Sequence, residues 1–170
     1  KPLHPAPDFD EGAIDRSAHL VGMMGAEPWQ RALNAGADVI LAGRSSDTAI
    51  FAAMPVMKGF PEGISWHMAK ILECGAASCV QRRTPDCMFA WVRKDHFVVE
   101  APDPTLRCSP QSIASHSLYE NADPFKLVEC SGTLDLTNSR YEAVSNTAVK
   151  VSGSEFIHAP RYTVKLEGAE

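Results

Sequence analysis

The stretch ADVILAGRSSD, residues 37–47, decides the fold that the sequence predicts. Its first six residues, 37–42, form an apolar run with β-branched side chains, which is typical of a strand buried on both faces. A glycine ends the run, and Ser46 or Asp47 is suited to cap a helix that we expect to end before Pro55. Open α/β sheets bind ligands where such a strand ends and a helix begins. The stretch therefore predicts an α/β unit with a ligand-binding loop after the strand.

Helical and strand-like patterns alternate in the first half of the chain, and strand-like patterns dominate the last third. Proline and serine residues suited to helix starts favour helices over 27–35, 65–79 (with Ser65 as its cap) and from Ser109-Pro110 to Asn121. Alternating runs favour a hairpin of 87–92 with 97–99 and, from Phe125 onward, short antiparallel strands that end in a strand at Tyr162 to Glu167. We therefore expect an α/β (α+β) fold, with helix–buried strand–helix units first and mainly antiparallel strands in the last third.

The domain organisation follows from the proline-rich start of the chain. Residues 1–20 are expected to be an extended lead-in and residues 21–170 one α/β domain, with a change of subdomain near residue 85. The final strand has no terminal helix or polar tail after it, so we expect the chain to be a fragment of a longer protein. Its apolar face should then be covered by the rest of the parent chain or in a homo-oligomer.

Composition excludes several classes of protein. The chain has 170 residues, 45% hydrophobic and 22% charged, which fits one or at most two globular domains. No apolar run is long enough to span a membrane, and no signal-like start is present. The net charge of -5, without a basic stripe, argues against a nucleic-acid partner. The five irregularly spaced cysteines are typical of reduced core thiols and favour a cytoplasmic location.

The loop Gly43, Arg44, Ser45 and Ser46 is the first candidate for substrate binding. It offers a flexible glycine, backbone N–H groups at a helix start and a guanidinium that suits a carboxylate or phosphate. The alternative is that Ser46 or Asp47 only caps the helix and that Arg44 makes a surface ion pair. Neither a Walker lysine nor a dinucleotide glycine pattern is present, so neither nucleotide motif supports the site.

Acid–base chemistry has its candidates in Asp47, Glu73 and His67. A carboxylate and an imidazole are the side chains that proton transfer most often uses, with Asp47 or Glu73 as base and His67 as acid. Cys74 shares a helix face with His67 but lies about 10 Å away along the axis, too far to act on one atom. The alternatives are a structural His67 and a Glu73 that only pairs with Lys70. No metal-ligand spacing occurs, so no metal site is predicted.

Four stretches of the sequence together resemble the acyclic terpene utilisation AtuA-type family. They are ADVILAGR (37–44) followed by Asp47, ILECGA (71–76), LYE (118–120) before Asp123-Pro124, and YTVKLEGA (162–169). They fall in order across most of the chain. The resemblance implies a bacterial catabolic protein linked to the breakdown of branched isoprenoids such as citronellol through acyl-CoA intermediates. It assigns no reaction and carries over no catalytic role.

Two functions remain open at this point. The preferred function is that of a lyase, hydratase or thioester hydrolase that acts on a small carboxylate or an acyl-CoA thioester. Such an enzyme is expected to need no cofactor, although CoA would be part of a thioester substrate. The alternative is a non-catalytic subunit or scaffold that partners a carboxylase-type enzyme. In an enzyme, Arg44, Asp47, His67 and Glu73 should converge on one concave site, whereas a scaffold should scatter them and expose an apolar patch.

Overall fold

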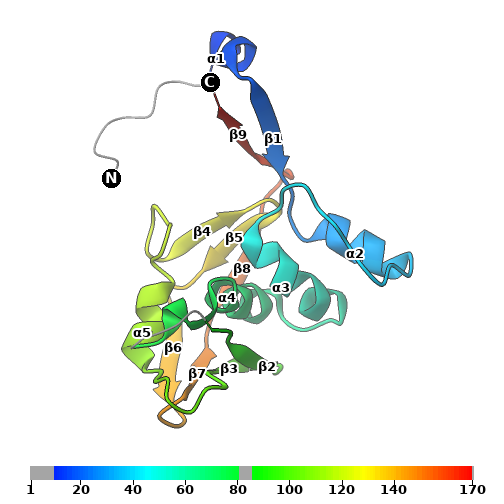
Figure 1. The fold of residues 1–170 in the computed structure, drawn as a ribbon. Helices are drawn as coiled ribbons and strands as arrows, with labels where there is room; N and C mark the ends of the chain where they lie inside the picture. Colours follow the sequence, from blue (N-terminus) through cyan, green and yellow to red (C-terminus); the bar gives the residue numbers. More distant parts are fainter. Residues whose placement is uncertain (1–9, 81–85, 170) are drawn as a thin grey trace.

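A computed structural model describes residues 10–80 and 86–169, which form an α+β fold (Figure 1). The helices are α1 (Glu11–Arg16), α2 (Glu27–Asn34), α3 (Asp47–Met57), α4 (Glu62–Leu72) and α5 (Pro110–His116), with a 3₁₀ turn, η1 (Gly75–Ser78), after α4. The strands are β1 (His19–Met23), β2 (Phe89–Val92), β3 (His96–Glu100), β4 (Lys126–Glu129), β5 (Gly132–Asp135), β6 (Arg140–Ala143), β7 (Ala148–Ser152), β8 (Glu155–His158) and β9 (Lys165–Ala169).

The described strands form three separate antiparallel sheets. Their orders are β2-β3-β7-β6, β4-β5-β8 and β1-β9. The first contains the predicted hairpin, in which Val92 pairs with Phe97 across the turn. The mainly antiparallel last third is therefore confirmed. Within the described ranges, parallel contact is limited to a single bridge between Met24 and Ser45.

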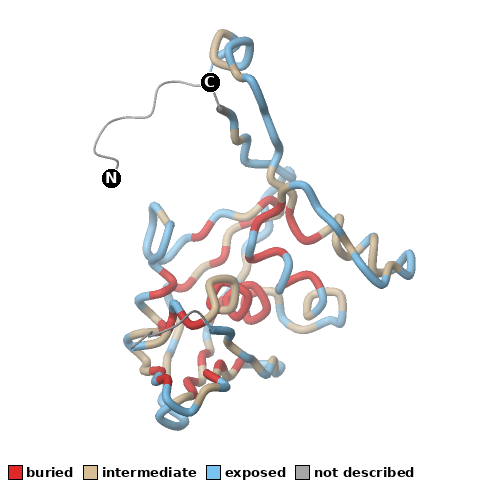
Figure 2. The backbone as a smooth tube through the Cα atoms, viewed as in Figure 1, coloured by how far each residue is buried: buried red, intermediate tan, exposed pale blue. Residues whose placement is uncertain are grey.

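Helix α4 lies at the centre of the core and packs against β2 and β3 of one sheet and β5 and β8 of another. All nine residues from 63 to 71 are buried, and Figure 2 shows this helix as the most buried element of the fold. Trp66 stacks on Phe156 with ring centroids 5.5 Å apart. At Gly63 a Cβ atom would lie 2.3 Å from the carbonyl oxygen of Ser154, so only glycine permits this close approach of helix and strand.

The prediction of a buried strand at 37–42 is wrong. This stretch is irregular, and the side chains of Val39 and Leu41 are 78% and 95% exposed. A strand needs a hydrogen-bonded neighbour, and the described residues supply none to this run. The β-branched composition favours an extended chain, but it does not create the partner. The helix–buried strand–helix unit therefore does not form here as predicted.

The predicted helices exist, but their ends differ. Helix α2 matches its prediction, with Pro28 in its first turn. Helix α3 continues through Pro55 to Met57, because a proline near the end of a helix removes only one hydrogen bond, while Met54 and Pro55 still accept from the N–H of Lys58. Helix α5 has the predicted serine–proline start, and it ends at His116, before the predicted end at Asn121.

Ser65 is not the cap of α4. The helix begins earlier, at Glu62, and the Ser65 hydroxyl donates a hydrogen bond back to the carbonyl of Pro61 at 2.9 Å. It ends at Leu72, and η1 covers part of the predicted remainder. In the predicted lead-in, residues 11–16 form α1 and β1 starts at His19, while residues 1–9 and the predicted boundary near 85 lie outside the described residues.

Strands β1 and β9 form a two-stranded ribbon that projects from the rest of the fold (Figure 1). Several of its apolar residues are exposed, with Leu20 at 39%, Val21 at 45% and Leu166 at 47%. The ribbon is anchored at its base, where the Gly25 N–H donates to the hydroxyl of Tyr162 at 2.9 Å. In the ranges that the structure describes, we find no helix with the length and apolarity to cross a membrane.

Candidate functional site

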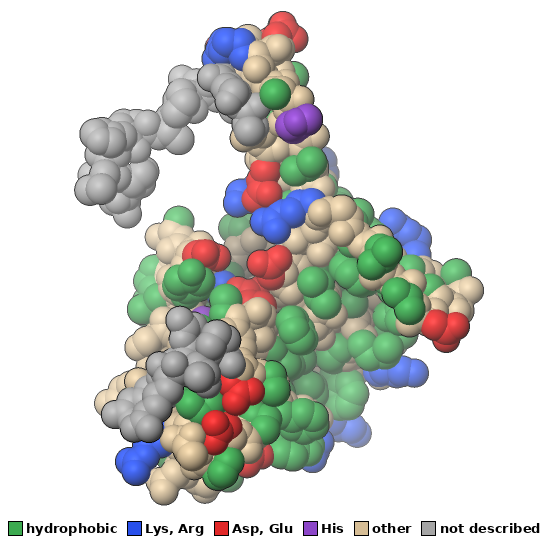
Figure 3. Space-filling view, in the orientation of Figure 1, with side chains coloured by type: hydrophobic (Ala, Val, Ile, Leu, Met, Phe, Trp, Pro, Cys, Tyr) green, Lys and Arg blue, Asp and Glu red, His purple; other side chains and the backbone are tan. Residues whose placement is uncertain are grey.

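A cavity of about 980 Å³ lies where the base of the ribbon, the start of α3, the end of α4 and strand β4 meet. Figure 3 shows basic and acidic side chains gathered below the ribbon. The lining includes four basic residues, Arg44, Lys70, Lys126 and Lys165, and five acidic ones, Asp47, Glu73, Glu120, Asp123 and Glu129. Because positive and negative charges nearly balance, the cavity as a whole does not select anions. Which charged groups are paired with one another decides which of them are able to bind a ligand.

The predicted loop reaches this cavity with three of its residues. The backbone of Met24 donates to the carbonyl of Arg44 at 3.2 Å and accepts from the N–H of Ser46 at 2.8 Å, which fixes the loop beside the end of β1. Arg44, Ser46 and Asp47 line the cavity. Ser46 stands at the N-cap of α3, but its side chain makes no capping hydrogen bond. The capping alternative therefore does not account for the Ser46 hydroxyl.

Gly43 and Ser45 lie elsewhere. Gly43 lines a separate, smaller cavity of about 210 Å³ together with Met24 and Trp29. Ser45 is buried, and its hydroxyl donates to the backbone carbonyl of Ser46 at 3.3 Å. These two residues shape the loop rather than the lining of the larger cavity.

Glu73 lies at the end of α4, inside the cavity, and both of its carboxylate oxygens are engaged. Lys70 Nζ contacts Oε1 at 2.5 Å, and the Thr48 hydroxyl donates to Oε2. The Lys70 and Glu73 side chains are only 8% and 6% exposed. The predicted pairing with Lys70 is thus present, and Glu73 is held as a fixed group at the cavity wall.

Glu129, at the end of β4, is the carboxyl group whose protonation the site changes most. Burial, with a smaller contribution from the nearby charge of Glu73, raises its pKa to about 7, although a hydrogen bond with Ser46 and the charge of Lys70 act in the opposite direction. A carboxyl group with a pKa near neutrality exchanges protons readily at physiological pH. Glu129 is therefore the best-placed acid–base group of the cavity.

Glu129 was not among the site residues predicted from the sequence, and its position in the fold is what points to it. In β4 the burial alternates, with Leu127 buried and Val128 exposed, so Glu129 falls on the inward face with Leu127. An acidic residue on the inward face of a strand is unusual and marks a group that needs a specific partner or function. The sequence around Glu129 contains no motif that would have predicted a site residue there.

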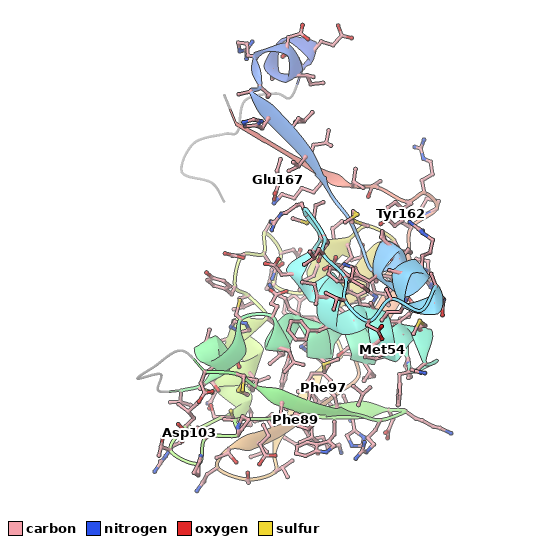
Figure 4. The ribbon with its side chains drawn as sticks, turned by 45° about the vertical axis from the view of Figure 1, so that its right-hand side comes forward. Met54, Phe89, Phe97, Asp103, Tyr162 and Glu167 are labelled. Atoms are coloured by element: carbon pink, nitrogen blue, oxygen red, sulfur yellow. The ribbon has the colours of Figure 1, made fainter. Side chains whose placement is uncertain are left out.

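Arg44 and Lys165 make the basic rim of the cavity on the ribbon side. Arg44 Nε lies 2.8 Å from Oε2 of Glu167, and Nη2 lies 3.3 Å from Oε1, so the guanidinium holds both oxygens of this carboxylate. Lys165 Nζ contacts the same carboxylate at 3.1 Å, and Asp47 lies 3.6 Å from Arg44. The hydrogen bond from Arg44 holds the pKa of Glu167 below its usual value. Figure 4 marks Glu167 on the ribbon.

A strained backbone position lies at the opposite wall. Glu120 has φ of 60°, a left-handed conformation that the other described non-glycine residues do not adopt. Residues other than Gly, Asn and Asp rarely adopt this backbone conformation, and such strained positions cluster at ligand sites. Glu120 lines the cavity beside Asn121, after the end of α5.

His67 does not join this site. Its side chain is completely buried in the core, with Nδ1 2.6 Å from the Ser154 hydroxyl and Nε2 3.2 Å from the Ser117 hydroxyl and 3.3 Å from that of Tyr141. Burial lowers its pKa to about 3, so the imidazole is neutral. Of the four residues expected to converge, Arg44, Asp47 and Glu73 meet in one cavity, and His67 lies away from it.

The described residues contain no group of three or more His, Cys, Asp or Glu side chains placed to hold a metal ion. All five cysteines are free thiols, as expected. The Sγ atoms of Cys79 and Cys108 are in contact at 3.7 Å, outside the cavity described above.

In comparison with known proteins, one family model matches part of the chain. Residues 11–79 match the family model described as Acyclic terpene utilisation family protein AtuA, which confirms the resemblance over this part of the chain. The matched residues include the 37–47 loop and Glu73, whereas Glu129 and Glu167 lie beyond them. No curated protein and no solved structure matches the chain.

Proposed function

We propose, from the resemblance of residues 11–79 to the acyclic terpene utilisation family, that this protein is an enzyme of branched isoprenoid breakdown. Its reaction would transfer a proton at the carbon beside the carbonyl of a small carboxylate or an acyl-CoA thioester, as a lyase or hydratase requires. The observation that carries the proposal is Glu129, a partly buried carboxyl group with its pKa raised to about 7, in a cavity with a basic rim.

In this reaction the Glu129 carboxylate takes the proton from the substrate carbon. The electron pair of the broken C–H bond moves to the carbonyl oxygen and forms an enolate, and the reverse step returns a proton from Glu129 to carbon. Burial and Glu73 keep Glu129 near half-protonated at neutral pH, so it is able to act in both directions. Ser46 orients its carboxyl group.

The fixed charges would then have separate roles. Arg44 and Lys165 would hold the substrate's anionic group at the rim, since a guanidinium binds a planar carboxylate through two hydrogen bonds. Glu73, whose oxygens are engaged by Lys70 and Thr48, would act as a fixed negative charge that adds to the effect of burial on the pKa of Glu129. His67 has a structural role in this proposal.

A scaffold is the second candidate, and one observation favours it. The run at 37–42 exposes Val39 and Leu41 to 78% and 95%, and exposed apolar runs of this kind are typical of interaction surfaces. The convergence of Arg44, Asp47 and Glu73 with Glu129 favours the enzyme. An enzyme with a partner surface would account for both observations.

Hydrogen–deuterium exchange at carbon tests the enzyme proposal without knowledge of the complete reaction. The protein is incubated in deuterated buffer with 3-methylbutanoyl-CoA or 3-methylbutanoate, and loss of the proton signal beside the carbonyl is followed by NMR. We expect exchange with the wild type and a reduction of about 10²–10⁴-fold with Glu129→Gln. Glu142→Gln, in an exposed pair with Lys150, is the matched control and should exchange at the wild-type rate.

Equal exchange rates for the wild type and Glu129→Gln would contradict the assigned role of Glu129. No exchange with either thioester or carboxylate, in protein that melts cooperatively, would favour the scaffold.

A further inference from the structure

We propose that Glu167 occupies the anion subsite of this cavity as an internal carboxylate, and that a substrate carboxylate binds by displacing it. This inference rests on the proposed function and deepens it, because it names the group that the basic rim recognises. In this arrangement the β1–β9 ribbon supplies the side chain that fills the rim of the cavity until a competing carboxylate displaces it.

The geometry around Glu167 is that of a bound carboxylate ligand. Arg44 contributes two hydrogen bonds, 2.8 Å to Oε2 and 3.3 Å to Oε1, one to each oxygen. Lys165 adds a third contact at 3.1 Å. Arg44 and Lys165 both line the cavity, so the position that Glu167 fills is at the rim, within reach of a ligand inside. Two-point binding of this kind selects a planar carboxylate over a single-point anion.

The remaining basic groups of the cavity are less suited to the task. Lys70 is committed to Glu73 at 2.5 Å in a nearly buried pair, and Lys126 contacts Asp135. Arg44 and Glu167, by contrast, keep 38% and 30% of their side-chain surface exposed. A partly exposed ion pair contributes little net stability, so opening the Arg44–Glu167 pair costs little free energy.

The position of Glu167 in the fold permits this exchange. Strand β9 pairs only with β1 in the described structure, and Figure 2 shows most of the ribbon as exposed. The N–H of Thr163 donates to the carbonyl of Cys130 at 2.9 Å and anchors the ribbon just before β9. Beyond that anchor, the Arg44–Glu167 contact ties β9 to the loop that precedes α3. Releasing it frees the rim without breaking the core.

Glu167→Gln tests the inference, because glutamine keeps the shape of the side chain and removes its charge. The probe is 3-methylbutanoate, and its Kd is measured by isothermal titration calorimetry. When Glu167 occupies the subsite, 3-methylbutanoate binds only to the fraction of molecules in which the subsite is open, which raises the apparent Kd of the wild type. If that fraction is about a tenth, the Kd of the variant should be about tenfold lower than that of the wild type. Glu142→Gln should bind like the wild type.

Two further arms identify the source of the effect. Arg44→Gln combined with Glu167→Gln should lose the gain, because the gain depends on the guanidinium. Coenzyme A without an acyl group presents phosphates but no carboxylate. If Glu167→Gln bound coenzyme A more tightly than the wild type did, but bound 3-methylbutanoate equally, the assignment of a carboxylate subsite would be overturned. An unchanged Kd for 3-methylbutanoate in Glu167→Gln, with cooperative melting preserved, would overturn displacement. Carbon exchange by Glu129 is a separate readout, so a failure of the proposed function and a failure of this inference are distinguishable.

Discussion

Replacing Glu129 by glutamine should stabilise the protein at high pH and leave it nearly unchanged at low pH. The pKa of Glu129 is raised from 4.5 to about 7 in the folded state, so the folded protein binds this proton more tightly than the unfolded chain. The wild type therefore loses stability as pH rises from 4.5 to 7, because the buried carboxyl group ionises at a cost. Glutamine stays neutral and avoids that loss.

The size of the effect follows from the same shift. Each unit between the two pKa values is worth about 1.4 kcal/mol, so the difference between variant and wild type should grow to about 3 kcal/mol above pH 7. Urea unfolding of both proteins at pH 4.5, 6 and 8 measures it. A difference that is the same at all three pH values would show that Glu129 has an ordinary pKa in the folded protein. If Glu129 is the proposed acid–base group, Glu129→Gln should gain stability and lose activity together.

The remaining predictions concern the core and the exposed surfaces. Burial lowers the pKa of His67 to about 3, so its protonation favours the unfolded chain as pH falls from 6.5 towards 3. Relative to His67→Gln, the wild type should then lose about 1.4 kcal/mol of stability per pH unit in urea unfolding. The absence of this slope would contradict a buried neutral imidazole. Gly63→Ala should destabilise by about 1–3 kcal/mol, because its Cβ would meet Ser154, and an unchanged urea midpoint would show that the helix moves freely. The exposed Val39 and Leu41 should drive self-association, so light scattering should give a smaller mass for the double substitution to serine than for the wild type. Equal monomer masses would exclude this.

Local chain chemistry allowed several elements to be predicted from sequence. Pro28 starts α2, and Ser109 with Ser112 forms a capping box that starts α5. The hairpin of β2 and β3 was predicted because its turn is polar and its strands are apolar. These features depend on residues that are close in sequence, so no knowledge of distant partners was needed.

Features that depend on distant residues were missed or misassigned. The apolar run at 37–42 has the composition of a strand but no pairing partner in the described structure. His67 was a plausible acid by residue type, yet three hydroxyl groups from distant segments enclose it in the core. The raised pKa of Glu129 depends on burial and on the proximity of Glu73, which is 56 positions away in the printed sequence. Long-range folding therefore decided which polar residues form the site.

The proposed acid–base function depends on the pKa of the Glu129 carboxyl group, which carbon-13 NMR measures directly. Protein labelled at the glutamate side-chain carboxyl carbon is titrated from pH 4 to 9, and the Glu129 signal is assigned by its absence in Glu129→Gln. We expect a midpoint of about 7 for this signal. A midpoint at the ordinary value of 4.5 would contradict it and would remove the basis for the proposed acid–base function.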